Sequence, residues 1–208
     1  MSELKTPYYL IDEARLADNM RVVDRLRELS GAKLLLALKC FASWGVFDLM
    51  RQHMDGTTSS SLYEVRLGQT RFGGETHAYS VAYSDDEIED VVSHADKIVF
   101  NSISQLTRFE AESAHIVRGL RLNPGASSSQ FDLADPSRPF SRLGEHDPKR
   151  IETVIDKISG FMVHNNCENG DFDLFDGLLA KVEARFGALF HKVEWVSLGG
   201  GIHFTGEG

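Results

Sequence analysis

A lysine at the end of an apolar run is the first residue whose type and position suit a covalent reaction with a ligand. Lys39 directly follows residues 34–38, which are all apolar, and Lys33 bounds the run on its other side. Such a run is typical of a strand buried on both faces. A desolvated lysine at its end loses its charge more easily and can form an imine with an aldehyde. The alternative is a lysine that extends its ammonium group into water.

A run of three glycines is the second candidate. Gly199, Gly200 and Gly201 follow a β-rich segment, and their backbone N–H groups could approach and bind a phosphate. The spacing is not that of the dinucleotide fingerprint GxGxxG, and no helix or downstream acidic residue follows. The segment therefore predicts either a phosphate site or a tight turn that leaves a strand.

A histidine and an arginine complete the set. His164 ends the apolar run 160–163 and opens a polar cluster, where its ring could stack on a cofactor. The alternatives are a buried histidine bonded to the backbone, or half of a metal site formed with Cys167. Arg121 lies inside the β-rich run 119–123, so its charge must face a polar site or lie at a solvent-exposed sheet edge.

Glu64, shortly after a run of three serines, could belong to the same hydrogen-bond network in a polar site as Arg121. Its alternative is a solvated glutamate in the first turn of a helix.

Seven short β-rich runs must position these residues. They alternate with amphipathic helical patterns, which indicates an α/β fold with a parallel sheet. The runs are residues 33–39, 56–60, 76–82, 97–101, 119–123, 160–164 and 193–198. Lys39 and His164 both end such runs, which is where a (β/α) barrel has its active site.

Capping and stop signals predict where the helices begin and end. They are Asp12 and Gly31 for the first helix, Ser84 with Glu87, Ser102 with Gln105, Asp147 before Pro148, and Asp171 with Gly187 for the last helix. Residues 124–148 have neither helical nor strand period and are rich in Ser, Asp, Pro and Gly. A connection of this length is predicted to be functional or mobile.

The composition excludes several classes of protein. The chain has 208 residues with 42% hydrophobic and 25% charged side chains, enough for one substantial core. A net charge of -9 without a basic cluster argues against a protein that binds nucleic acid and is compatible with a cationic small-molecule substrate. The sequence has no leader-like segment and no apolar run long enough to cross a bilayer, so we expect a cytoplasmic protein that does not associate with a membrane. Because Cys40 and Cys167 lie far apart, we expect reduced thiols and no bound metal.

The candidate segments occur together in a recognisable order. That order resembles the fold-type III pyridoxal-phosphate enzymes, the group of alanine racemase and of the ornithine and diaminopimelate decarboxylases. The segments are Ala-Leu-Lys-Cys-Phe, Thr-Ser-Ser-Ser-Leu-Tyr-Glu, Leu-Arg-Leu-Asn-Pro-Gly, Ser-Arg-Leu-Gly, His164 and Gly-Gly-Gly. Within the group, Leu-Lys-Cys-Phe-Ala, Val-His-Asn-Asn-Cys-Glu-Asn and Leu-Gly-Gly-Gly-Ile-His-Phe-Thr look most like the branch that decarboxylates carboxynorspermidine or carboxyspermidine. The likeness covers essentially the whole chain.

The resemblance implies a pyridoxal 5'-phosphate-binding (β/α)8 barrel of the alanine racemase type and a carboxy-lyase of polyamine biosynthesis. Lys39 would hold the cofactor as a Schiff base, His164 would stack on its pyridine ring, and Arg121 would contact its phenolic oxygen. The three glycines would bind its phosphate, and the cofactor would accept the electrons left by CO2. Cys167 stands where ornithine decarboxylases tend to have a phosphate-binding serine, which leaves the second phosphate contact open.

The relatives are longer than this chain. They continue with an eighth barrel strand, which carries the acidic partner of the pyridine nitrogen, and then with a β-rich domain that completes the active site of the partner subunit. We therefore expect residues 1–208 to form one barrel domain, truncated after the seventh strand and inactive by itself, from an enzyme that is a homodimer at full length. The alternatives are a single-domain protein that stores or delivers the cofactor, another fold-type III amino-acid decarboxylase, or a barrel enzyme for a different phosphorylated ligand.

Overall fold

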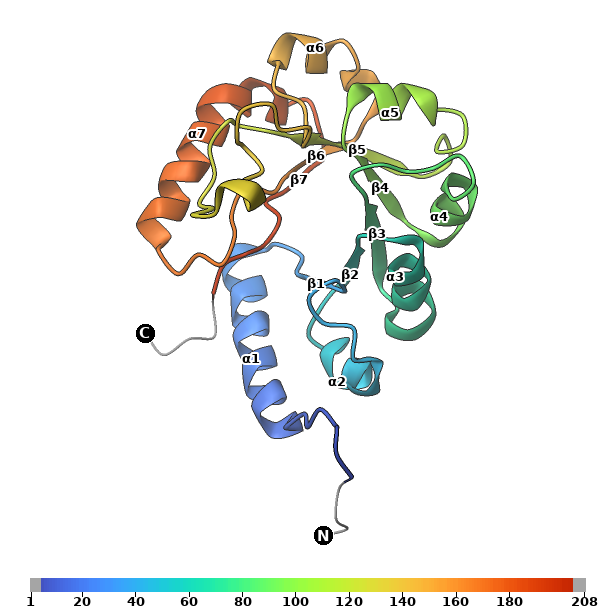
Figure 1. Ribbon diagram of the computed structural model, residues 1–208, viewed down its shortest axis with the longest axis vertical. Helices are drawn as coiled ribbons and strands as arrows, with labels where there is room; N and C mark the ends of the chain where they lie inside the picture. Colours follow the sequence, from blue (N-terminus) through green and yellow to red (C-terminus); the bar gives the residue numbers. More distant parts are fainter. Residues whose placement is uncertain (1–4, 204–208) are drawn as a thin grey trace.

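The computed structural model describes residues 5–203. Seven parallel strands lie in one sheet in chain order: β1 (Leu35–Ala37), β2 (Gly56–Ser59), β3 (Glu75–Tyr79), β4 (Lys97–Phe100), β5 (Val117–Leu122), β6 (Gly160–Val163) and β7 (Trp195–Ser197). The sheet curls, with helices on its outside (Figure 1). Within the described residues, β1 pairs with β2 alone and β7 with β6 alone, so the curl is open between β1 and β7. The predicted parallel barrel with seven strands is confirmed.

The helices connect these strands. They are α1 (Glu13–Ser30), α2 (Phe47–Met50), α3 (Leu62–Leu67), α4 (Ile88–His94), α5 (Ile103–Arg108), α6 (Pro148–Glu152) and α7 (Phe172–Phe190), with a π-helical turn at Gly68–Phe72 after α3. The predicted caps at Asp12, Ser102, Asp147 and Asp171 are confirmed, because each side chain accepts a hydrogen bond from the first turn of its helix. Gly31 ends α1 in the left-handed conformation, with φ 67°.

The predicted strand 76–82 is too long, because β3 ends at Tyr79, and two predicted helix boundaries are wrong. Ser84 does not cap α4, because residues 85–87 form a hydrogen-bonded turn and the hydroxyl of Ser84 donates to the Glu87 carboxylate instead of accepting from a backbone N–H. Gly187 does not stop α7, which continues to Phe190. Phe186 and Leu189 are both buried on the same face, so packing favours the extra turn over the glycine's preference to end it.

The outer face of the sheet holds the main core. Successive side chains of a strand point to opposite faces. The outward-pointing residues of the central strands are fully or nearly fully buried beneath the helices: Ile98, Phe100, Leu120, Leu122, Phe161 and Val163. Burying each such side chain contributes roughly 1.5–3 kcal/mol. The outer face therefore stabilises the curl and leaves the inner face free for polar residues.

The N-terminal end of the inner face is closed by a large ring and an ionic cluster. Trp195 covers two glycines, since a Cβ at Gly160 would lie 2.1 Å from its indole and one at Gly119 would lie 2.5 Å away. The Lys97 ammonium lies 5.6 Å from the centre of that ring and 3.0 Å from the Glu75 carboxylate. Burial raises the pKa of Glu75, but hydrogen bonds from basic neighbours, Lys97 among them, outweigh it and lower that pKa to about 2.

Among the described residues, no helix combines the length and the apolar character that crossing a bilayer requires.

Candidate functional site

Polar side chains gather where β3, β4, β5 and β6 end. Tyr79 is the last residue of β3, Asn101 directly follows β4, Arg121 is the second-last residue of β5, and His164 directly follows β6. Because the strands are parallel, these ends share one rim of the curled sheet, the rim at which barrel enzymes have their active sites. Arg121 and Asn101 are each only 4% exposed.

Arg121 is a buried cation on a central strand. Its Nη2 donates to the carbonyl of His164 at 2.9 Å, and its Nη1 donates to the hydroxyl of Tyr79. No ion pair joins it to a carboxylate among residues 5–203. The predicted alternative of a solvent-exposed edge arginine is wrong, because β5 lies between β4 and β6. A buried charge without a counter-charge is costly, so this position favours an anionic ligand atom.

His164 connects Arg121 to the glycine run. Burial lowers the pKa of His164 to about 4, with further lowering from the positive charges of Lys39 and Arg121. The imidazole is therefore neutral near pH 7. Its Nδ1 accepts a hydrogen bond from the N–H of Gly200 at 3.4 Å, which leaves the ring proton on Nε2. Within the described part of the chain, no three His, Cys, Asp or Glu side chains are grouped to hold a metal ion.

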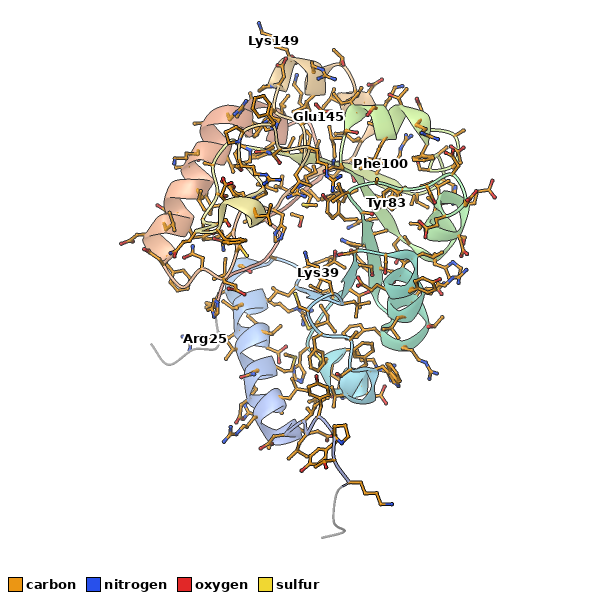
Figure 2. All side chains as sticks on the ribbon, in the orientation of Figure 1. Arg25, Lys39, Tyr83, Phe100, Glu145 and Lys149 are labelled. Carbon is orange, nitrogen blue, oxygen red and sulfur yellow. The ribbon has the colours of Figure 1, made fainter. Side chains whose placement is uncertain are left out.

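Lys39 lies in the turn that follows β1. The backbone N–H of Cys40 and that of Phe41 both donate to the carbonyl of Ala37, which fixes the turn. Lys39 lies on the inner side of the curl, facing the rim (Figure 2). The side chain is exposed, so the desolvation predicted for it is not seen; β1 ends two residues before the end of the predicted strand 33–39.

The three glycines have different reasons to lack a side chain. Gly199 and Gly201 have φ of 71° and 91°, and a Cβ would lie 2.8 Å from the Val163 carbonyl oxygen at the first and 2.5 Å from that of Asn166 at the second. A tight turn therefore accounts for both. It does not account for Gly200, where a Cβ would meet nothing within 4 Å. At that position the space where a side chain would lie is open, while the backbone N–H donates to Nδ1 of His164.

Hydrogen bonds fix the long connection 124–148 to residues that follow β5 and β6. The Asn123 side chain donates to the carbonyls of Pro136 and Leu143, at 2.8 and 2.7 Å. Ser128 accepts from the N–H of Cys167 at 2.9 Å, so the loop lies against the polar segment after β6. Before α6 the connection contains one short 3-10 helix, Asp132–Ala134, and a single bridge from Glu145 to Leu122, and it lies at the rim where the site residues meet.

Glu64 does not join Arg121 in any contact of the described residues. Its N–H is capped by the Ser61 hydroxyl at 3.3 Å, and its carboxylate accepts from the N–H of Ser60 at 2.6 Å. The alternative of a glutamate in the first turn of a helix is therefore the one observed, with the side chain partly exposed.

Sequence reasoning missed Tyr79, Asn101 and Asn123. Asn101 and Asn123 end the β-rich runs 97–101 and 119–123, as His164 ends the run 160–164. That position was the available signal, but a single asparagine there is also common in ordinary turns. Tyr79 lies inside the predicted run 76–82, so only the observed end of β3 places it at the rim.

Curated decarboxylases are similar in sequence to this chain along nearly its whole length. A carboxynorspermidine/carboxyspermidine decarboxylase of Herminiimonas arsenicoxydans is 64% identical over 205 residues, which are 99% of this chain and 56% of the relative. A carboxyaminopropylagmatine decarboxylase of Synechocystis sp. is 34% identical over 210 residues, 100% of this chain and 54% of the relative. No family model matches the chain.

Solved structures agree with these relatives. The crystal structure of carboxynorspermidine decarboxylase from Campylobacter jejuni, complexed with norspermidine, superposes with a TM-score of 0.88 at 34% identity, over 99% of this chain and 53% of that one. Diaminopimelate decarboxylase from Helicobacter pylori, complexed with L-lysine, has a TM-score of 0.71 at 16% identity over 94% of this chain and 55% of that one, which shows the shared fold alone. The chain spans about half the length of the curated relatives it matches.

Proposed function

Because the chain belongs to the fold-type III decarboxylases, we propose that it is the barrel part of a pyridoxal-phosphate enzyme that decarboxylates carboxynorspermidine or carboxyspermidine. One observation carries the proposal. Lys39 follows β1, and Arg121, which has no carboxylate partner among the described residues, lies at the end of β5. The neutral ring of His164 follows β6 and accepts from Gly200, beside which the space is open, so the four positions share one rim of the barrel.

The residues at the rim fit the three polar parts of pyridoxal phosphate. The exposed Lys39 amine suits the aldehyde carbon, and Arg121, which lacks a carboxylate partner among the described residues, suits the ionised phenolic oxygen. Gly200 leaves open space where a side chain would lie, which suits the approach of a phosphate to the backbone of the glycine run. The flat ring of His164 would lie against the pyridine face.

When bound, the cofactor supplies an electron sink for the carbanion that CO2 leaves behind. The chain itself supplies attachment, orientation and charge. Lys39 would tether the cofactor until the substrate amine displaces it. Arg121 would hold a positive charge beside the phenolic oxygen, and His164, neutral at pH 7, would add a stacking surface without adding a second cation.

The substrate assignment rests on the relatives and on charge. The Campylobacter jejuni neighbour was solved with norspermidine, a cationic amine, and this chain has a net charge of -9. An acidic surface attracts a polycation and repels anionic competitors. We further propose a cytoplasmic homodimer, as the resemblance implies.

Release of CO2 tests the function. The chain and the complete reading frame from which it comes are each loaded with pyridoxal phosphate and given carboxynorspermidine, carboxyspermidine, ornithine or diaminopimelate. From the product of the complete reading frame we expect at least a roughly tenfold preference in kcat/KM for one of the carboxylated polyamines, equivalent to about 1.4 kcal/mol of transition-state binding, and from the chain alone little or no CO2. A preference for ornithine or diaminopimelate would contradict the substrate. A bound cofactor with no CO2 from any compound would favour the protein that stores or delivers cofactor.

Replacing Gly200 with valine tests the phosphate site. We expect the dissociation constant for pyridoxal phosphate to rise at least about tenfold, because the valine side chain would fill the open space and obstruct the approach of the phosphate to the backbone. The fold should survive, because the space beside Gly200 is open and its φ is not in the left-handed region. Fluorescence titration measures the affinity.

Gly177→Val is the matched control, since a Cβ there also meets nothing within 4 Å and the position lies on the exposed face of α7. It should bind the cofactor as the wild type does. Equal affinity in the Gly200 variant and the wild type would mean that the phosphate binds elsewhere and that the glycine run is only a turn.

A further inference from the structure

A chain of hydrogen bonds runs across the rim from β5 to the end of the long loop. The Tyr79 hydroxyl accepts from Nη1 of Arg121 and lies 3.1 Å from Oδ1 of Asn101. The same oxygen of Asn101 accepts from the N–H of Gly144 at 3.0 Å, and its Nδ2 donates to the carbonyl of Arg142 at 2.8 Å. Tyr79 is therefore the link between the buried guanidinium and the segment 142–144.

The direction of each hydrogen bond in the chain is fixed by its chemistry. A guanidinium can only donate, so the phenol must accept from Arg121 and has one proton left, which it gives to Asn101. Burial raises the pKa of Tyr79, against the lowering effect of the Arg121 and Arg142 charges, so the phenol keeps that proton at neutral pH. Asn101 is in turn oriented by Gly144 and Arg142, which require its oxygen and its nitrogen respectively.

Two anchors hold the plane of the guanidinium. Nη2 is fixed by the His164 carbonyl and Nη1 by the Tyr79 hydroxyl, while the Tyr79 ring lies 5.2 Å from the central carbon of the guanidinium. A guanidinium has five N–H donors, so donors remain for a ligand once both anchors are made. An arginine side chain has several rotatable bonds, and removing one anchor would let the group turn away from that ligand.

We propose that Tyr79 is a positioning residue that holds Arg121 in place to contact the cofactor's phenolic oxygen, and that it couples this contact to the segment 142–144. The inference rests on the proposed function, because it takes the phenolic oxygen as the ligand of Arg121. Tyr79 does not itself touch the reacting atoms. Its hydroxyl acts through Arg121, and its ring supports the guanidinium from one side.

The test is Tyr79→Phe, which removes the hydroxyl and keeps the ring. Tyr83→Phe is the matched control, because Tyr83 is also buried but packs on Phe100 with ring centres 6.0 Å apart, on the outer side of the sheet (Figure 2). Both proteins and the wild type are loaded with pyridoxal phosphate. The visible absorbance band is then titrated with pH, and the cofactor affinity is measured.

A fixed cation beside the phenolic oxygen favours the form of the bound cofactor that carries one proton fewer. Loosening Arg121 should therefore raise the pH midpoint of the visible band in Tyr79→Phe by roughly half a unit or more, and weaken cofactor binding about three- to tenfold. Tyr83→Phe should match the wild type in both. A merely structural role for Tyr79 would lower thermal stability without moving the midpoint.

Asn101→Ala breaks the chain one step further from Arg121 and serves as the second variant if Tyr79→Phe does not fold. It should shift the midpoint in the same direction by a smaller amount. Midpoints equal to the wild type in whichever variants fold would overturn the inference while leaving the proposed function intact. A wild type with no visible band that borohydride can reduce would overturn the proposed function, and the inference with it.

Discussion

Replacing Lys39 with alanine should abolish the visible absorbance of the protein with pyridoxal phosphate and should lower CO2 release by the full-length protein about a thousandfold or more, because the amine proposed to hold the aldehyde is gone. In the wild type, borohydride reduction followed by peptide mapping should find the pyridoxyl group on Lys39. This is the largest effect that we expect from any single substitution in the chain.

Lys39→Arg is the control for charge. It keeps a positive charge near His164, so the low pKa of that imidazole should persist, yet a guanidinium does not form the imine. The arginine variant should therefore be as inactive as the alanine variant. A pyridoxyl group found on a different lysine of the wild type, or visible absorbance retained by both variants, would contradict the assignment.

Replacing Arg121 with methionine should weaken cofactor binding by about a hundredfold, as for the loss of a hydrogen-bonded charge contact in a buried site. It should also raise the pKa of His164 above about 4, because one of the two positive charges that lower that pKa is removed while burial and Lys39 remain. The first effect is measured by fluorescence titration. The second is measured by NMR titration of the histidine ring in cofactor-free protein.

Arg121→Lys separates charge from geometry. It keeps the cation but lacks the planar fork that contacts both Tyr79 and the His164 carbonyl. The pKa of His164 should stay low, while cofactor affinity still falls. Wild-type affinity in both Arg121 variants would show that the phenolic oxygen has a different partner.

The strands could be predicted because their signal is local. Each strand of a parallel barrel is buried on both faces or nearly so, and the apolar runs 97–101 and 160–164 mark β4 and β6 to within one residue. The boundaries that failed depend on tertiary contacts. Gly187 signals a helix end, but burial of Leu189 extends α7 past it.

The sequence by itself determined the parallel α/β fold, the seven strands in order and the identities of Lys39, Arg121, His164 and the glycine run as candidates. These follow from side-chain type and period along the chain. The order of the motifs along the chain also predicted the likeness to the fold-type III decarboxylases, which the relatives confirm.

Only the tertiary structure decided how the candidates meet. Pairing of the strands in the curled sheet brings together residues 36 to 43 positions apart, so that Arg121 donates to the His164 carbonyl and His164 accepts from Gly200. It also revealed Tyr79 and Asn101 as partners of Arg121 and distinguished Gly200, which lies in open space, from Gly199 and Gly201, which the backbone requires. A sequence pattern reports which face of a strand a side chain occupies, but contacts between strand ends depend on register and curl, which are set by packing across the whole sheet.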